Sequence, residues 1–537
     1  MNEKPASKPF TLVHAAVILV VFGTIGPLVF ITARAAGWSI GASVTAVAVT
    51  FAIGTLTIHR VVPDALPSHR RGYSALFGLW VLLGLAAGYR VVSLSVFMLD
   101  ATRSEFAVAT KQRHFDDEEM NRPFSPRHNC FTSYVIGARL AQDGEANIYD
   151  PEHYRDSAEP TDIHEEIGEV LTIDSYQYPP PFLLMPRVLL TIADGFFEVR
   201  TYWFTINVIV FSAAVAMLGY WIAGRRFSAF WLSWPIVVMA PTTVLTLQIG
   251  NVHFLIISMS LLAMALIEKG RERLGALVLG FVIVGKVFPG LLLVYLIFRR
   301  RWRAVVWTTG AMAAYCIATL VTFGAQVWQA FFDYQLPRLA SGDAFRFARE
   351  NARAITGNSS IMGFVYKLRA LGLLEGVDDE LLAGGLMWVF TAAILLMLFL
   401  AAKAHRRADG FRPVIATDDA EAESRRRHNL VAAWTVILIL GQLRSPFLPW
   451  TYGNIAVLWL LAMLIPTHKP WRARTAAILL AAVVFGIDVP LPYGPGSTTW
   501  DHVYTLIALP VCLGICVVVI VRQLGMRPAP APVRSGG

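Results

Sequence analysis

The sequence predicts an all-α polytopic membrane protein, a bundle of roughly 12–14 transmembrane helices of ~20 residues each. Of its 537 residues, 55% are hydrophobic and only 15% are charged, and the mean hydropathy is +0.54. Soluble domains carry about 25% charged residues, so this composition is typical of a chain that lies mostly in lipid. Apolar runs recur from Phe10 to Val521, which indicates many crossings.

The net charge of +9 follows from Arg and Lys residues gathered in short connecting loops. The positive-inside rule explains this pattern without a nucleic-acid-binding surface. Of the four cysteines, Cys316, Cys512 and Cys516 lie in apolar runs, and Cys130 alone lies in a large loop. The loops therefore offer no disulfide framework.

The first 98 residues are expected to form three transmembrane helices, near 10–32, 39–58 and 74–98. The first apolar run is too long for a cleaved signal peptide and is interpreted as an uncleaved helix entering from the cytoplasm. Residues 99–200 then form a large extracytoplasmic loop between the third and fourth helices. Its part from Asp100 to Tyr178 is polar, acidic and aromatic, and the short proline-rich stretch 179–196 is expected to lie in the membrane interface.

Residues 201–323 are expected to form the transmembrane core, with helices near 201–223, 228–248 and 254–267. The following stretch, 275–298, decides the topology. Basic clusters flank it at Arg271–Arg273 and Arg299–Arg303, and a single crossing would leave one cluster outside. Two short helices that meet at the glycines and proline of 285–290 keep both clusters on the cytoplasmic side. The sequence therefore predicts a helical hairpin.

The rest of the chain continues this alternation. A helix near 304–323 leads to a second extracytoplasmic loop, 324–382. Residues 383–522 hold the C-terminal helices, and residues 523–537 are expected to be a disordered cytoplasmic tail, so that both termini are cytoplasmic. No internal repeat of the transporter type is present. The C-terminal helices are expected near 383–401, 429–442, 450–466, 474–488 and 502–522.

Three basic or titratable residues at the predicted outer face are candidates for binding an anion. Lys286 lies at the break of the hairpin, where a lysine suits a phosphate, although it can also snorkel to the lipid headgroups. Arg444 is a second phosphate ligand or an interfacial anchor. His253 is an acid, a phosphate donor or a packed polar residue. Ionisable groups at membrane depth are costly, which favours a function.

The candidate general bases are carboxylates of the large loop. The run that contains Asp116, Asp117 and Glu118 is either a solvated loop or the source of a base. Asp100 competes with it because it directly follows an apolar helix. No metal-ligand spacing, nucleotide-binding glycine loop or Ser/His/Asp elbow is present, so neither a metal nor a cofactor is expected.

Short motifs occur in order between residues 130 and 455. They are an aromatic helix with a Tyr-Asp pair (131–151), a Tyr-Pro-Pro segment (178–181), Gly-Asn-Val-His (250–253) and Gly280 through Lys286 to Pro289, with weaker echoes near 357–360 and 445–452. This set resembles the GT-C superfamily of membrane glycosyltransferases. Within it, the set is most similar to glycosyltransferase family 87, which includes polyprenyl-phosphate-mannose-dependent mannosyltransferases.

The resemblance implies a GT-C-like bundle and an inverting transferase. The donor would be a polyprenyl-phosphate sugar, with mannose the usual one, and the acceptor a lipid or glycan on the extracytoplasmic face. Lys286, Arg444 and His253 would bind the donor phosphate. Aromatic residues at this depth also form ordinary interface belts. The residues that would line the sugar and acceptor site are Tyr134, Tyr176, Tyr178, Asn251, Asn358 and Trp450.

One position departs from the family pattern. Where the family has its catalytic aspartate, before the aromatic helix, this chain has Asn129 and Cys130. Either the base has moved to Asp100 or to the 116–119 run, or the protein does different chemistry. A lipid or sugar-lipid transporter, or an inactive scaffold derived from a transferase, is therefore the alternative function.

Overall fold

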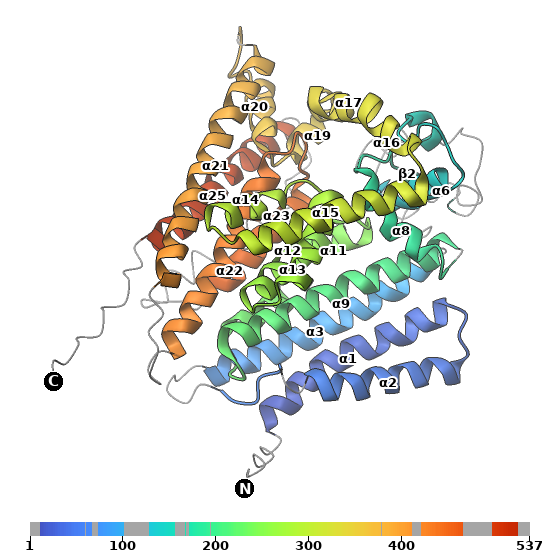
Figure 1. The fold of residues 1–537 in the computed structure, drawn as a ribbon, viewed down its shortest axis with the longest axis vertical. Helices are drawn as coiled ribbons and strands as arrows, with labels where there is room; N and C mark the ends of the chain where they lie inside the picture. Colours follow the sequence, from blue (N-terminus) through green and yellow to red (C-terminus); the bar gives the residue numbers. More distant parts are fainter. Residues whose placement is uncertain are drawn as a thin grey trace, which may run out of the picture.

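The computed structural model is an all-α membrane protein whose long helices pack side by side (Figure 1). It describes residues 11–58, 61–66, 73–100, 128–155, 167, 171–193, 195–376, 378–410, 420–464 and 497–524. Within these residues, six helices are long and apolar enough to cross a membrane, or seven if the bent pair α10–α11 is one span. The larger number of crossings that the sequence predicts also counts shorter helices and stays a prediction.

The N-terminal half contains the expected first helices and one helix pair that differs from expectation. The predicted single helix near 228–248 is wrong: the chain bends by 57° between α10 and α11, because Pro241 cannot continue the preceding helix. The large loop contributes a two-stranded parallel sheet that the sequence did not predict. The elements are α1 (Leu12–Ala35), α2 (Ile40–Ile58), α3 (Tyr73–Leu99), β1 (His128–Asn129), α6 (Cys130–Gln142), η1 (Pro151–Tyr154), β2 (Thr172–Ile173), η2 (Pro180–Leu183), α8 (Leu184–Leu189), α9 (Phe196–Ala223), η3 (Ala229–Leu232), α10 (Ser233–Met239), α11 (Pro241–Gln248) and α12 (His253–Glu268).

The C-terminal half begins with the predicted hairpin. The expected loop 324–382 is largely a series of short helices, and the expected helices near 383–401 and 429–442 are longer than predicted. The predicted helix near 474–488 lies outside the described residues. The elements are α13 (Glu272–Gly285), α14 (Gly290–Phe298), α15 (Trp302–Phe323), α16 (Gln326–Ala330), η4 (Phe331–Gln335), α17 (Leu336–Ser341), η5 (Asp343–Phe345), α18 (Phe347–Glu350), α19 (Ala352–Gly357), α20 (Ile361–Ala370), α21 (Asp379–Gly410), α22 (Ala420–Leu443), α23 (Trp450–Leu464) and α25 (Ser497–Leu524).

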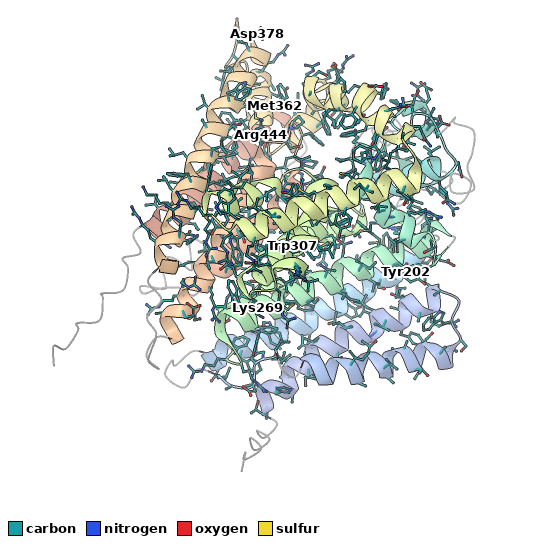
Figure 2. All side chains as sticks on the ribbon, in the orientation of Figure 1. Tyr202, Lys269, Trp307, Met362, Asp378 and Arg444 are labelled. Carbon is teal, nitrogen blue, oxygen red and sulfur yellow. The ribbon has the colours of Figure 1, made fainter. Side chains whose placement is uncertain are left out.

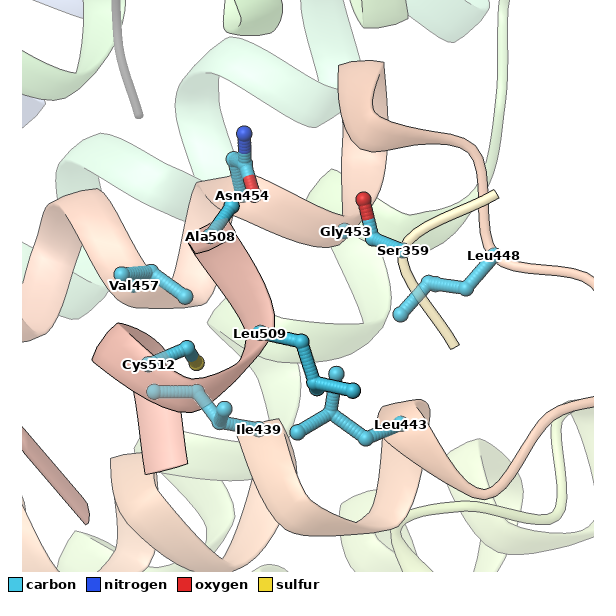
Figure 3. Close-up of a pocket in the computed structure, with 10 residues that line it drawn as sticks. All are labelled: Ser359, Ile439, Leu443, Leu448, Gly453, Asn454, Val457, Ala508, Leu509 and Cys512. Atoms are coloured by element: carbon cyan, nitrogen blue, oxygen red, sulfur yellow. The ribbon is translucent and has the colours of Figure 1, made fainter. Parts of the chain in front are cut away.

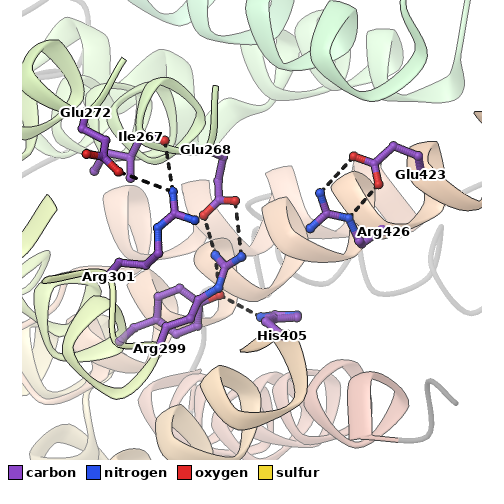
Figure 4. A network of polar contacts seen from close by, with 9 residues as sticks. Ile267, Glu268, Glu272, Arg299, Arg301, His405, Glu423 and Arg426 are labelled. Atoms are coloured by element: carbon purple, nitrogen blue, oxygen red, sulfur yellow. Dashed lines mark hydrogen bonds and ion pairs between the residues drawn. The ribbon is translucent and has the colours of Figure 1, made fainter. Parts of the chain in front are cut away.

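The hairpin is confirmed by ion pairs that join its two ends. Arg299, which follows α14, pairs with Glu268 at the end of α12, and both side chains are buried. Arg301 and Arg303 lie 3.8 and 3.4 Å from Glu272 at the start of α13. Figure 4 shows the contacts of Arg299 and Arg301, and Tyr295 extends this network to His405 of α21. Both basic clusters therefore lie on one side, as the hairpin requires.

The same side of the bundle collects the other basic loops. Arg225 pairs with Asp64 at 3.0 Å, and Arg427 donates to the carbonyl of Trp221 at the end of α9. Thr11 caps α1 and donates to the carbonyl of Asp64. We call this side, defined by Arg225, Arg299, Arg301 and Arg427, the basic end. The opposite side, where α6, β2 and α8 lie together in Figure 1, is called the loop end.

Candidate active site

The parallel strands at the loop end fix the start of α6. β1 pairs with β2 in the register His128–Thr172 and Asn129–Ile173. Asn129 then caps α6 by accepting a hydrogen bond from the backbone N–H of Phe131 at 3.0 Å, as asparagine often does at a helix start. The Phe131 N–H also donates to the carbonyl of Ile249 at 3.2 Å. The loop and the turn before α12 are thereby held together.

A cluster of buried aromatic rings packs against Phe131 at the start of α6. Tyr134 packs edge-to-face against Tyr178, Phe182 and Trp203, and its hydroxyl lies 3.0 Å from that of Tyr178. Tyr176 packs against Tyr178 as well. Burial raises the pKa of the Tyr178 phenol, so both hydroxyls stay protonated and can donate hydrogen bonds. The three tyrosines predicted to line a sugar site, Tyr134, Tyr176 and Tyr178, therefore lie together.

Lys286 is held at the edge of this aromatic cluster. Its Nζ lies 3.3 Å from the Tyr178 hydroxyl and 2.9 Å from Nδ1 of His253. It also lies over the rings of Tyr178 and Tyr452, at 4.8 and 5.8 Å from their centroids, where the negative ring faces attract a cation. The predicted break therefore places the lysine among hydroxyl, imidazole and aromatic groups.

His253 joins Lys286 to the start of α6. Its ring is stacked between Tyr452 and Phe288, and its Nδ1 lies 2.9 Å from Oδ1 of Asn251 as well as from Lys286. A neutral Nδ1 either donates or accepts, so it can hydrogen-bond only one of these two neighbours at a time. Asn251 in turn donates to the Cys130 thiol at 3.4 Å.

The helix ends around this cluster suit an anion beside Lys286. α6 begins at Cys130 and α12 begins at His253, and the first turn of a helix carries partial positive charge. α13 ends at Gly285, where its carbonyl groups favour the lysine ammonium. The geometry thus provides a cation, two donor hydroxyls and two helix starts within one small region.

Three other predicted residues lie away from this cluster. Arg444 is exposed and its Nε donates to the Thr391 hydroxyl of α21 (Figure 2). Asn358 is buried and serves the backbone, accepting from the N–H groups of Ser360 and Leu448 and donating to the carbonyl of Pro446. Trp450 is half-buried beside Gly357.

Among the described residues, none of the carboxylates predicted to be the base lies in this cluster. Asp100 follows α3, whose main neighbours are α1, α9 and α10. Asp116, Asp117 and Glu118 lie outside the described residues. The structure instead reveals Asp174, which directly follows β2 and which sequence reasoning missed. Its place at the site follows from the pairing of β1 with β2. The neighbouring sequence does not distinguish this aspartate from the others in the loop.

An apolar pocket lies on the other side of the first turn of α23. It lies between α22, α23, α25 and the turn before α20 (Figure 3). Gly453, which lines it, directly follows Tyr452 of the cluster. A hydrophobic surface therefore adjoins the polar cluster. The lining residues are Ser359, Ile439, Leu443, Leu448, Gly453, Asn454, Val457, Ala508, Leu509 and Cys512.

Gly250 lies where the turn before α12 packs closely against the start of α6. It has a φ of +69°, and a Cβ there would lie 2.5 Å from the Cβ of Phe131. We expect Gly250→Ala to lower the free energy of unfolding by about 2–5 kcal/mol, from left-handed strain and overpacking together. Thermal unfolding in detergent measures this. Gly144→Ala is the matched control, because Gly144 has a φ of +79° but no described atom within 4 Å of its added Cβ. Equal losses in both variants would contradict the clash.

Two comparisons with known proteins agree with this geometry. Residues 176–417 match the model of glycosyltransferase family 87. The chain is also 26% identical over 361 residues, covering 62% of this chain and 75% of the relative, to a Mycobacterium tuberculosis protein. That relative is named polyprenol-phosphate-mannose-dependent alpha-(1-2)-phosphatidylinositol mannoside mannosyltransferase. The matched range contains Tyr178, His253 and Lys286, and the helices around them are those of a membrane protein. Residues 176–417 of this membrane protein are therefore similar to glycosyltransferase family 87.

Proposed function

We propose that this chain transfers mannose from a polyprenyl-phosphate donor to a lipid or glycan acceptor, with inversion at the anomeric carbon. The observation that carries the proposal is the placement of Lys286 beside His253 and the Tyr178 hydroxyl. A cation and hydroxyl donors arranged before the reaction stabilise the charge that develops on a leaving phosphate. The printed name of the mycobacterial relative supports the donor class and a glycolipid acceptor.

The neighbouring surfaces suit the remaining parts of such a donor. Tyr134, Tyr176 and Tyr178 provide aromatic faces and hydroxyls for a sugar ring. The apolar pocket behind Tyr452 has the polarity that a prenyl chain needs. Because the lipid carries both the sugar and the leaving group, the reaction as proposed requires no cofactor.

We place the reaction on the extracytoplasmic face of the bacterial inner (plasma) membrane. The Arg and Lys residues of the basic end favour the cytoplasm under the positive-inside rule. The loop end, which holds Lys286, then faces outward. The start of α1 and the end of α25, where Gln523 donates to the carbonyl of Asn429, both lie at the basic end, which supports cytoplasmic termini.

The proposal is tested by reconstituting the purified protein in liposomes with polyprenyl-phosphate-mannose and a membrane-lipid extract. We expect release of polyprenyl phosphate and the appearance of a mannosylated product, both of which depend on added extract. A parallel reaction without extract measures hydrolysis of the donor. If neither mannose nor other lipid-phosphate sugars give release, the transferase proposal fails, and transport of the lipid or a scaffold role becomes the better explanation.

A further inference from the structure

Asp174 is the carboxylate that the fold brings to the active site. Because Asn129 pairs with Ile173 at the ends of the two parallel strands, the residues that directly follow them are Cys130 and Asp174. Neighbouring strands lie about 4.8 Å apart, so these two residues are adjacent although they are distant in sequence. The carboxylate therefore stands where α6 begins.

Hydrogen bonds hold the Asp174 backbone in this place. Its N–H donates to the hydroxyl of Thr132 at 3.0 Å, and that hydroxyl donates to the carbonyl of Asn129 at 2.7 Å. The side chain of Asp174 is half-buried and hydrogen-bonds with the Cys130 thiol. The position of the carboxylate is thus set by both strands rather than by a loop alone.

A short path of contacts joins Asp174 to the cation. Cys130 accepts from Asn251 at 3.4 Å, and Asn251 lies 2.9 Å from the His253 ring, which contacts Lys286. The carboxylate and the ammonium are therefore linked through one group of residues. This is the arrangement that proton removal at an acceptor and charge stabilisation at a leaving phosphate both require.

Cys130 itself is not suited to take a proton. Burial, and then the negative charge of Asp174, raise the pKa of the Cys130 thiol well above its ordinary value. The thiol is therefore protonated and can donate to the carboxylate.

We propose that Asp174 is the general base of the glycosyl transfer, a proposal that rests on the function proposed above. The acceptor O–H bond breaks and its proton passes to the Asp174 carboxylate, while the acceptor oxygen bonds to the anomeric carbon. The bond from that carbon to the phosphate oxygen breaks, and its electron pair leaves with the lipid phosphate, which Lys286 faces. Cys130 positions the carboxylate through its thiol.

The test compares variants in the liposome assay with polyprenyl-phosphate-mannose and lipid extract. Asp174→Asn keeps the shape of the side chain and is expected to lower kcat by about 100-fold or more, since a general base contributes 10²–10⁴-fold. The apparent KM for the donor is expected to stay within about threefold, because Asp174 acts on the acceptor. Adding Cys130→Asp to this variant supplies a carboxylate at the start of α6, next to position 174, and is expected to restore at least about tenfold of the lost kcat.

Asp143→Asn is the matched control, because Asp143 is exposed at the opposite end of α6. It should keep the kcat of the unmodified protein. The base assignment is overturned if Asp174→Asn retains most of its kcat, or if its loss appears in donor KM and Cys130→Asp restores nothing. If the unmodified protein releases no polyprenyl phosphate, the proposed function fails, and the base assignment fails with it.

Discussion

Replacing Lys286 by alanine is expected to lower turnover of the lipid-phosphate donor by about 100-fold, since removal of one preorganised donor to developing charge costs 10²–10³-fold in kcat. The described contacts of Lys286 are to the Tyr178 hydroxyl, the His253 ring and two aromatic faces. None of these carries a full negative charge, so the ammonium is available to an anionic ligand. The measurement is release of polyprenyl phosphate at saturating donor.

Lys269→Ala is the control for this experiment. Lys269 also holds its ammonium over a tyrosine ring, 5.3 Å from the centroid of Tyr220, but it is exposed at the basic end (Figure 2). That variant should transfer sugar at the normal rate. Lys286→Arg keeps the charge but not the compact ammonium, and an intermediate rate is expected. A Lys286→Ala protein with nearly normal turnover would remove the phosphate role of this lysine.

Replacing Arg299 by methionine is expected to give the largest loss of stability. Its guanidinium pairs with the Glu268 carboxylate, with Nη2 at 3.3 Å from Oε2, and its side chain is fully buried. The substitution leaves Glu268 as a buried charge without this partner, which typically costs about 3–5 kcal/mol. We expect a clear fall in the midpoint of thermal unfolding in detergent.

The double variant Arg299→Met/Glu268→Leu is expected to recover most of that loss, because both charges are then removed together. Arg303→Met serves as the control: Arg303 also pairs with an acidic residue, Glu272, but its side chain is 84% exposed. Exposed pairs contribute little, so this variant should unfold near the normal midpoint. Equal stability of Arg299→Met and Arg303→Met would show that the buried pair does not clamp the hairpin.

The hairpin between the basic clusters could be predicted because its signal is local. Glycine and proline at 285–290 break a helix wherever they occur, and the charges at 271–273 and 299–303 exclude a single crossing. The bend at Pro241 has a local signal too, but the apolar run 228–248 is long enough for one helix and conceals it. The length of a run alone therefore does not determine whether a span is continuous.

Part of the site could also be predicted. The sequence predicts candidate roles for six residues that the structure brings together: Lys286, His253, Asn251, Tyr134, Tyr176 and Tyr178. Three other residues predicted for the site contact other parts of the protein: Arg444, Asn358 and Trp450. A polar residue at a helix end is predicted to lie at the loop end. The sequence does not predict in which direction its side chain points.

By itself, the sequence determined the membrane class, the hairpin and the single lysine at its break, because hydropathy, charge and helix breakers act over a few neighbouring residues. Only the tertiary structure brought Asp174 to the group of residues that leads to that lysine. Asp174 reaches the site through a two-residue strand that pairs with the strand before α6, and the local sequence of so short a strand gives no pairing signal. The pairing is accompanied by close packing of α6 against the turn at Gly250, and both involve residues far apart in the chain.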